Sequence, residues 1–196
     1  MKQIAVLISG RGSNMAALID AQSTHYKIAL VISNVDGASG LARAQAAGIA
    51  TCVITHNGKT RPDFDAEIDT ALRAARIDLV VLAGFMRILS DGFVRSWEGR
   101  LINIHPSLLP KYKGTHVHER VLEAGDTVSG ASVHFVVPEL DAGPVIAQAS
   151  VPVHSDDTPE TLAARVLGIE HTLYPKAVAL LAQDGVRLEN GQAVFA

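Results

Sequence analysis

The chain has 196 residues, of which 48% are hydrophobic and 19% charged, which is typical of a globular domain with a substantial core. Its formal net charge is −3, and its 17 lysine and arginine residues are spread along the chain, which argues against a nucleic-acid-binding surface. The single cysteine, Cys52, excludes an internal disulfide and an all-cysteine metal cluster, and it indicates a cytoplasmic protein.

From the N-terminus onward, short apolar runs alternate with amphipathic segments. The apolar runs cover residues 3–8, 27–33, 50–55 and 78–84, and the amphipathic segments cover 14–22, 40–48 and 64–77. This alternation predicts strand and helix in turn. The first run is too short to span a membrane, so no membrane partner is expected. Because the apolar runs are continuous, helices should cover both faces of a doubly wound, mostly parallel, Rossmann-like α/β sheet.

The helix expected at residues 63–77 shows the spacing of an amphipathic helix. Phe64, Ile68 and Leu72 recur at intervals of four and should form its buried stripe. Asp65 is expected to face water. This helix should therefore cover one face of the sheet.

The second half of the chain has a different pattern. A short helix at 91–97, a strand at 100–105 and a helix at 116–124 are expected first, and Leu109-Pro110 is a candidate for a cis bond. Residues 129–140 and 143–153 predict two antiparallel strands joined by a turn at residues 141–143, at the edge of the sheet. Thr158-Pro159 should begin a long helix that Pro175 kinks or divides, and an Asn-Gly turn predicts a terminal hairpin. We expect one domain over residues 1–196, with halves at 1–100 and 101–196.

The first candidate site is the loop Ser9-Gly10-Arg11-Gly12-Ser13-Asn14, between the first strand and the first helix. Its glycines permit a tight turn, and the following helix N-terminus offers free N–H groups and a positive dipole end to an anion. Met15 replaces the third glycine of the dinucleotide motif G-x-G-x-x-G, which disfavours a nicotinamide oxidoreductase and favours a phosphomonoester. The alternative is that Ser13 and Asn14 only cap the helix.

The second candidate site is the end of the strand at 100–105. In an extended segment, Asn103 and His105 share a face at the carboxyl end of a parallel strand, where ligands bind in open α/β folds. An amide donor beside a titrating imidazole suits a reaction that creates an oxyanion. The alternative is a structural histidine at a strand end. Asp141 is a candidate carboxylate or an ordinary turn residue, and His134, within a strand, is expected to be structural.

Five segments together resemble the folate-dependent phosphoribosylglycinamide formyltransferases. These segments are SGRGSN, AGFMRIL, NIHPSLLPKYKG, SVHFV and ELDAGPVI. HPSLLP alone is less specific, because relatives that act on formylmethionyl transfer RNA or hydrolyse formylfolate share it. The first loop, and a length without room for a further domain, favour the transformylase. The resemblance implies a formyltransferase fold and transfer of formyl from 10-formyltetrahydrofolate to the amine of glycinamide ribonucleotide, in purine biosynthesis, through a tetrahedral oxyanion intermediate.

The resemblance also implies the roles of individual residues. Asn103, His105 and Asp141 would be catalytic, within a catalytic and folate-binding half at residues 101–196 that follows a phosphate-binding half at 1–100. We further hypothesise that Asn103 and protonated His105 donate to the oxyanion, and that Asp141 favours the imidazolium and arranges the water that moves the proton. Gly12, Ser13 and Asn14 would hold the phosphate, and Glu170 would contact the ribose. The formylfolate pocket would be built from Arg61, Met86, Arg87, Ile88, Leu89, Asn103, Val137, Pro138, Glu139, Leu140 and Asp141.

Several positions depart from the family pattern. Pro138 lacks the N–H that a folate hydrogen bond would use, Leu167 replaces a polar substrate contact, and Lys113 and Thr115 alter the loop after LLPKY. A formyltetrahydrofolate hydrolase and a noncatalytic nucleotide-binding module are the alternative functions. No metal is expected, and the protein should be a monomer or a homodimer.

Overall fold

The computed structural model describes residues 1–22 and 24–196, which form fifteen helices and strands. In chain order they are β1 (Lys2–Ile8), α1 (Ser13–Asp20), β2 (Tyr26–Ser33), α2 (Ser39–Ala46), β3 (Ala50–Val53), α3 (Arg61–Ala74), β4 (Leu79–Leu82), α4 (Asp91–Ser96), β5 (Leu101–His105), α5 (Val117–Glu123), β6 (Val128–Phe135), β7 (Val145–Pro152), α6 (Pro159–Ala182), β8 (Val186–Glu189) and β9 (Gln192–Phe195). The expected alternation of strand and helix is confirmed.

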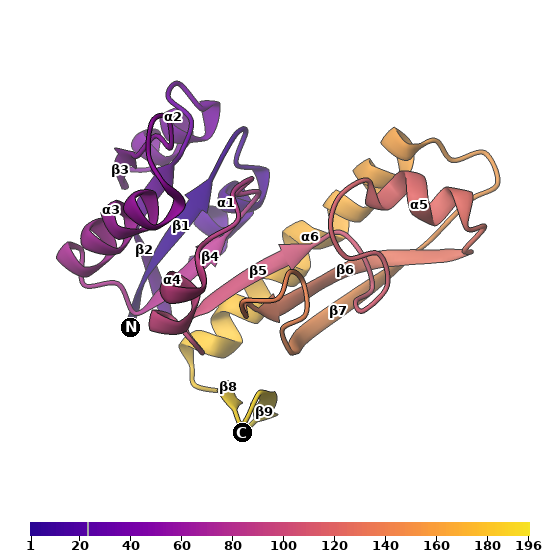
Figure 1. Cartoon of the computed structure of the whole chain (residues 1–196). Coiled ribbons are helices and arrows are strands. Elements are labelled where there is room, and N and C mark those ends of the chain that lie inside the picture. Colours follow the sequence, from indigo (N-terminus) through magenta and orange to yellow (C-terminus); the bar gives the residue numbers. More distant parts are fainter. Residues whose placement is uncertain (23) are drawn as a thin grey trace.

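The main sheet has seven strands in the order β3-β2-β1-β4-β5-β6-β7. The first five are parallel to one another, and β6 and β7 add an antiparallel edge, as the sequence predicted. The chain starts at β1 and then builds outward in both directions, so β1 and β4 flank the point where the strand order reverses (Figure 1). Ligands bind at such a point in open α/β sheets, outside the carboxyl ends of the strands.

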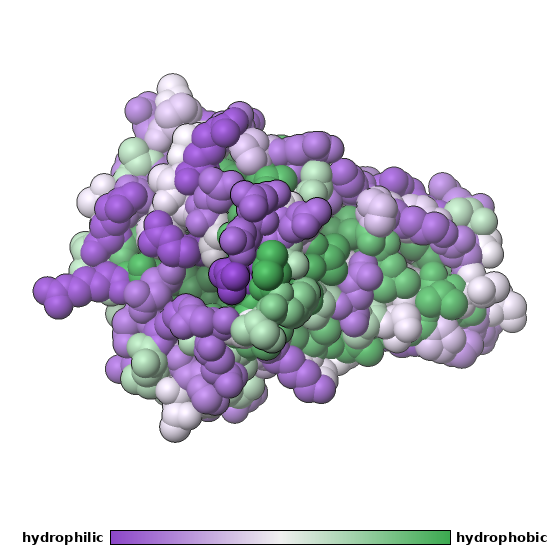
Figure 2. Space-filling view, turned by 90° about the horizontal axis from the view of Figure 1, so that it is seen from below, coloured by the Kyte–Doolittle hydropathy of each residue, from purple (hydrophilic) through white to green (hydrophobic). Residues whose placement is uncertain are grey.

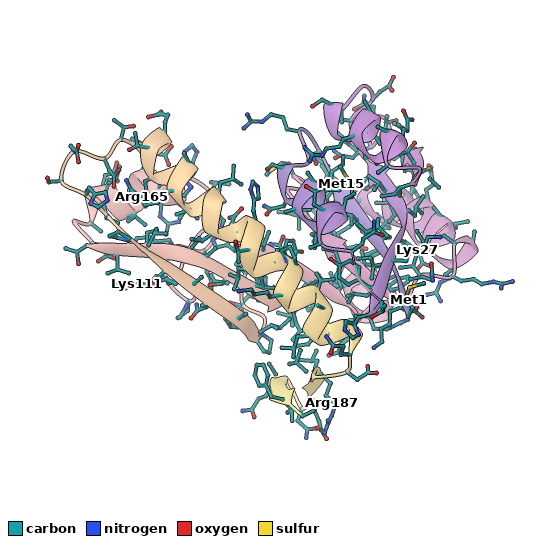
Figure 3. All side chains as sticks on the ribbon, turned by 180° about the vertical axis from the view of Figure 1, so that it is seen from behind. Met1, Met15, Lys27, Lys111, Arg165 and Arg187 are labelled. Carbon is teal, nitrogen blue, oxygen red and sulfur yellow. The ribbon has the colours of Figure 1, made fainter. Side chains whose placement is uncertain are left out.

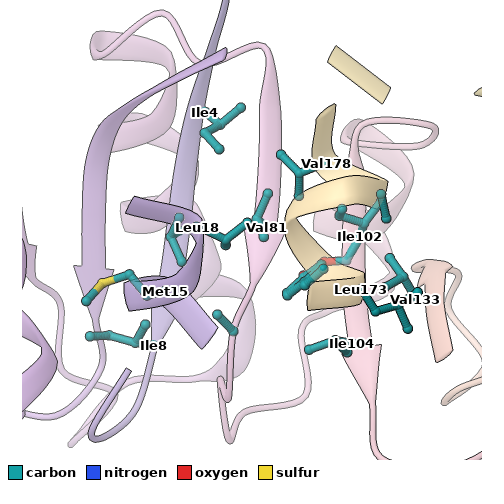
Figure 4. Packing of buried hydrophobic residues seen from close by; sticks show 14 of the residues in the cluster. Ile4, Ile8, Met15, Leu18, Val81, Ile102, Ile104, Val133, Leu173 and Val178 are labelled. Carbon is teal, nitrogen blue, oxygen red and sulfur yellow. The ribbon is translucent and has the colours of Figure 1, made fainter. Parts of the chain in front are cut away.

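Helices cover both faces of the parallel part of the sheet. α1, α2 and α6 pack against side chains such as Ile4 and Ile102 on one face, whereas α3 and α4 pack against Ala5 and Leu7 on the other. Ile102 and Ile104 of β5 face Leu173 and Val178 of α6 (Figure 4). The alternate residues of β5 must therefore point to the opposite face.

The antiparallel edge extends the molecule beyond the parallel layers. α6 crosses the back of the sheet diagonally, from the end of the molecule that carries Arg165 toward the hairpin of β8 and β9 (Figure 3). Seen from below the view of Figure 1, hydrophobic surface gathers over the end formed by β6 and β7 (Figure 2). α6 packs against both halves of the chain, on the face of the sheet that carries Ile4 and Ile102.

The structure corrects two expectations about local structure and confirms a third. Pro175 does not divide the last helix, because α6 continues from Pro159 to Ala182 with Pro175 buried inside it. β6 ends at Phe135 and β7 begins at Val145, so residues 136–144 connect them instead of a tight turn at 141–143. The Leu109-Pro110 bond is cis.

Asp65 was expected to face water but is 2% exposed. One oxygen of its carboxylate accepts a hydrogen bond from the backbone N–H of Ser90 at 2.6 Å. Its polar partner thus lies in a loop far away in sequence, which the helical periodicity of residues 63–77 could not reveal. Asp65 anchors the end of the segment that includes Met86 to Leu89.

Gly143 fixes the course of the connection between β6 and β7. A Cβ added at this position would lie 1.7 Å from the carbonyl oxygen of Phe135, which belongs to the strand itself. We therefore expect Gly143→Ala to lower the free energy of unfolding by roughly 3 kcal/mol, because backbone must move to relieve the overlap. Gly168→Ala is a matched control, since a Cβ there has no neighbour within 4 Å and an alanine suits the interior of a helix. Denaturant unfolding measures both variants, and equal midpoints would contradict the expectation.

Candidate active site

The anion loop, residues 9–14, lies at the carboxyl end of β1. Gly12 has φ of +66° and is the N-cap of α1, and neither Ser13 nor Asn14 caps that helix with its side chain. The first intrahelical bond runs from the N–H of Ala16 to the carbonyl of Gly12 at 2.8 Å, so the preceding N–H groups have no partner within the helix. The helix-capping alternative is therefore wrong, and the loop has free donors for an anion.

Ser9 joins the anion loop to two neighbouring strand ends. Its hydroxyl donates to Oδ1 of Asn34 at 2.5 Å and accepts from the N–H of Met86 at 2.7 Å. The N–H of Ser9 itself donates to the carbonyl of Gly84 at 3.1 Å. The carboxyl ends of β1, β2 and β4 are thus held together by one side chain.

Glu170 of α6 reaches the anion loop from the other half of the chain. The Nδ2 atom of Asn14 donates to its Oε2 at 2.7 Å, and both side chains are buried. Burial raises the pKa of Glu170, and the hydrogen bond from Asn14 acts in the opposite direction. One helical turn later, the hydroxyl of Tyr174 donates to the carbonyl of Leu82 at 2.7 Å. This contact fixes α6 against the end of β4, so that Glu170 lies beside Asn14.

Asn103 and His105 share one face of β5, as the sequence predicted. Because Ile102 and Ile104 face α6, the two polar side chains point to the opposite face, where α4 ends. His105 is 5% exposed. Its Nε2 lies 2.9 Å from the carbonyl oxygen of Tyr112, and its Nδ1 lies 3.4 Å from Oδ2 of Asp141. Both ring nitrogens therefore lie beside oxygen acceptors.

His134 is a site residue that sequence reasoning treated as structural. β6 pairs antiparallel with β5 in a register that places His134 directly opposite Asn103. Its Nδ1 lies 2.8 Å from the carbonyl of Phe135, so Nδ1 carries the hydrogen and Nε2 can accept from Nδ2 of Asn103 at 3.4 Å. Burial lowers the pKa of His134, with His105 acting in the same direction and with the Phe135 carbonyl and Asp141 opposing it. A neutral His134 thus orients the amide of Asn103.

Asp141 reaches the two histidines from the connection between β6 and β7. Its φ of +49° is uncommon for a residue with a side chain, and such strain concentrates at functional sites. Its Oδ2 accepts from the N–H of Gly114 at 2.9 Å, and its Oδ1 lies 3.7 Å from Nε2 of His134. The sequence left open whether Asp141 reaches His105, and the structure brings them together. Residues 112–114 contact both His105 and Asp141 and cover them.

An apolar pocket lies beside these residues. Its cavity volume is about 110 Å³. It is lined by Leu82, Phe85, Arg87, Ile88, Leu89, Val94, Asn103, His134, Val136, Val137, Pro138, Leu140 and Asp141. Most of the residues expected in a folate pocket therefore meet here.

Three of the expected pocket residues lie elsewhere. Arg61 is the first residue of α3 and is exposed, and the exposed Glu139 pairs with Lys113 at 3.2 Å. Met86, 76% exposed, borders the anion loop instead. Conversely, Phe85 lines the pocket and stacks on Phe64 of α3 with 6.4 Å between ring centroids, a contact between distant segments that no local pattern could predict.

One segment after β4 separates the two cavities. Ala83, Gly84 and Met86 border the cleft next to the anion loop, which is also lined by Ser9 to Asn14 and Leu167. Phe85 and residues 87–89 border the apolar pocket. Asn103 of β5 pairs with Leu82 at the end of β4 and lines the apolar pocket.

Known proteins share extensive sequence similarity with this chain. The formyl transferase family matches residues 2–178. The chain is 52% identical over 195 residues to the trifunctional purine biosynthetic protein adenosine-3 of Bos taurus, covering 97% of the chain and 19% of that protein. It is 48% identical over 194 residues to the phosphoribosylglycinamide formyltransferase of Escherichia coli, covering 97% of the chain and 92% of that protein. The chain thus spans less than a fifth of the multifunctional relatives and nearly all of the bacterial one.

Solved structures agree with the sequence comparison. The phosphoribosylglycinamide formyltransferase of Anaplasma phagocytophilum superposes with a TM-score of 0.93 at 48% identity, covering 100% of this chain and 94% of that one. Glycinamide ribonucleotide transformylase 1 of Symbiobacterium toebii superposes with a TM-score of 0.95 at 39% identity, with the same coverage of each chain. The chain therefore belongs to the formyl transferase family.

Proposed function

We propose that the chain transfers the formyl group of 10-formyltetrahydrofolate to the primary amine of glycinamide ribonucleotide, a step of purine biosynthesis. The observation that carries this proposal is the position of Asn103 and Asp141 on the wall of the apolar pocket, with His105 3.4 Å from Asp141 and the cleft of the anion loop on the other side of residues 83–89. The two cavities differ in chemistry. One cavity borders free N–H groups suited to a phosphate, and the other is apolar and suited to a pterin. The printed names of the relatives support the same substrates.

The two substrates are assigned to the two halves of the chain. The phosphate would bind to Gly12, Ser13 and Asn14 in residues 1–100, with Glu170 of α6 accepting from the ribose. The folate would enter the apolar pocket, largely built from residues 101–196 and the segment 85–89. Pro138 lines this pocket without an N–H to offer, so the polar edge of a pterin must pair with neighbouring backbone.

The residues at the end of β5 would stabilise the transition state. The amine nitrogen forms a bond to the formyl carbon, the bond to N10 of the folate breaks, and a proton passes from the amine to N10. Negative charge collects meanwhile on the formyl oxygen, to which Nδ2 of Asn103 would donate. His134 holds that amide in place through Nε2. Asp141 would act as the base that carries the proton, directly or through water.

His105 needs a rearrangement before it can donate to this oxygen. Its Nε2 is already bonded to the carbonyl of Tyr112, and Asp141 is bonded to the N–H of Gly114. We propose that residues 112–114 move away when the substrates bind, which frees both side chains at once. Lys113, paired with Glu139, would hold this segment in place until then.

A kinetic assay distinguishes this function from hydrolysis. Consumption of 10-formyltetrahydrofolate is followed by absorbance with and without glycinamide ribonucleotide. Transfer predicts that consumption depends on the ribonucleotide. Equal rates in both reactions would indicate a hydrolase, which the comparisons do not favour, and no consumption together with ribonucleotide binding would indicate a noncatalytic module.

Glu170 allows a prediction in which stability and function change in opposite directions. Because burial raises the folded pKa of Glu170 above the ordinary 4.5, folding becomes less favourable as pH rises from 4.5 through the folded value. Glu170→Gln removes this penalty and keeps an oxygen for Asn14, so at pH 7 we expect a gain of roughly 1 kcal/mol, or about 2–4 °C in melting temperature.

The same substitution should weaken the ribonucleotide, because a neutral amide is a poorer acceptor for ribose hydroxyls than a carboxylate. We expect KM for the ribonucleotide to rise about tenfold at pH 7, and the stability gain to shrink as pH falls toward 4.5. Thermal unfolding across this pH range and steady-state kinetics measure the two effects. A variant less stable than the parent at pH 7 would contradict the role of burial.

Other expectations stay predictions. These are a monomer or a homodimer, a cytoplasmic location, and the absence of metal and nucleic-acid partners. Within residues 1–22 and 24–196, no helix is long and apolar enough to cross a membrane. The same residues contain no cluster of three or more histidine, cysteine or acidic side chains that could hold a metal.

A further inference from the structure

The cleft beside the anion loop carries one unusual side chain. Arg11 is the only charged residue among the described residues that line it. The rest of the lining consists of glycines, the polar Ser9, Ser13 and Asn14, and the apolar Ala83, Met86 and Leu167. Arg11 is exposed, and its guanidinium makes no ion pair with any residue that the structure describes. It is therefore available for a ligand.

The backbone that carries Arg11 is held firmly by α2. The carbonyl of Gly10 accepts from the N–H of Gly40 at 3.1 Å. A Cβ at Gly40 would lie 2.6 Å from Cδ1 of Ile8 and 3.3 Å from the carbonyl oxygen of Arg11, so only glycine permits this close approach. The loop is thus fixed on both sides of Arg11, while the side chain remains free to meet a ligand.

A phosphate bound in the cleft would need a cation to balance its charge. A phosphate monoester carries a charge of about −1.5 to −2 at pH 7, whereas a helix N-terminus supplies only about +0.5. Glu170 lies on the same side, bonded to Asn14, and adds negative charge when it is ionised. Leu167 contributes no charge from the facing wall. Backbone donors alone would therefore leave much of the phosphate charge unbalanced.

A second observation places a ligand in this cleft independently of charge. Asn14 is 8% exposed and borders the cleft, and its Oδ1 has no hydrogen-bond partner among the described residues. A buried acceptor without a partner costs free energy, so a donor such as a ribose hydroxyl would satisfy it. Phosphate and sugar would then lie next to each other along the loop.

We propose that Arg11 binds the phosphate of the nucleotide substrate and sets the preference of this chain for phosphorylated over unphosphorylated amines. The proposal rests on the proposed function, and it assigns to a loop arginine the charge neutralisation that Leu167 cannot provide. A guanidinium suits this role because its planar donors can engage two phosphate oxygens at once. A lysine at the same position would retain the charge but lose the paired hydrogen bonds.

Two variants and one ligand test the proposal. We expect Arg11→Ala to raise KM for glycinamide ribonucleotide about 10- to 100-fold, with kcat within about twofold, since a charge-assisted contact is lost in ground state and transition state alike. Arg11→Lys should recover part of the loss. Isothermal titration with ribose 5-phosphate should show the same weakening, whereas KM for glycinamide riboside, which lacks the phosphate, should not change.

Arg95→Ala is the matched control, because it removes one exposed arginine on α4, outside both cavities. It should leave every constant within about twofold. An unchanged KM and an unchanged ribose 5-phosphate affinity in Arg11→Ala would overturn the proposal, as would an equal rise in KM for the riboside. If the parent chain transfers no formyl group but Arg11→Ala still weakens ribose 5-phosphate, the proposed function fails while this inference stands.

Discussion

Asn103→Ala should lower kcat roughly 100- to 1,000-fold while leaving the fold intact. Removal of one oxyanion donor typically has an effect of this size, because the lost interaction forms only as charge develops. His134 Nε2 would also lose the amide that it orients. The half-buried position on β5 tolerates alanine, since the packing of this strand on α6 depends on Ile102 and Ile104. Steady-state kinetics and thermal unfolding measure the two parts of this prediction.

Asn57→Ala is the control for this variant. Asn57 is also an asparagine, but it lies in an exposed turn outside both cavities, so its truncation should leave turnover unchanged. Turnover of Asn103→Ala within about threefold of the parent enzyme would remove Asn103 from the mechanism. A loss of turnover that accompanies a large drop in melting temperature would instead indicate a structural role.

Asp141→Asn is expected to reduce kcat roughly 100- to 10,000-fold, the range in which a positioned acid or base contributes. The substitution keeps size and shape, and asparagine tolerates the positive φ of this position as well as aspartate does. The amide oxygen can still accept from Gly114, so the turn should persist. What disappears is the negative charge 3.4 Å from Nδ1 of His105.

The pH profile separates this role from simple packing. Without the carboxylate, no side chain at this position can accept the proton of the amine, so kcat should stay low across the whole pH range. Asp156→Asn, an exposed carboxylate far along the chain, is the control and should reproduce the parent profile. An Asp141→Asn enzyme with parental kcat at every pH would contradict a proton-transfer role.

Much of the fold followed from the sequence because it depends on local patterns. Continuous apolar runs predicted parallel strands with helices on both faces, and the pattern change after Gly125 predicted the antiparallel edge. The placement of Asn103 and His105 on one face required only the alternation of a strand. The Asn-Gly turn likewise predicted the final hairpin.

The features that escaped prediction depend on contacts between distant residues. His134 belongs to the site because the register of β5 and β6 sets it opposite Asn103, and sequence alone does not give a register. Asp65 is buried because its partner is the N–H of Ser90. Pro175 remains within α6, where packing on the sheet holds the helix together despite the lost hydrogen bond.

The resemblance to a family supplied what neither patterns nor geometry could. Glu170 has no local signal of function, and only the resemblance assigned it to the ribose; the structure finds it bonded to Asn14 of the anion loop. The same resemblance assigned Arg61 to the folate pocket, and Arg61 does not line the apolar pocket. The roles of both residues stay predictions.

The fate of the formyl carbon tests the proposed reaction most directly. The chain is incubated with glycinamide ribonucleotide and 10-formyltetrahydrofolate labelled with carbon-13 in the formyl group, and the products are examined by nuclear magnetic resonance. Transfer at Asn103, His105 and Asp141 predicts that the label appears on the amine nitrogen of the ribonucleotide, with one formyl group gained for each folate consumed. Label recovered as free formate, with the ribonucleotide unchanged, would contradict it.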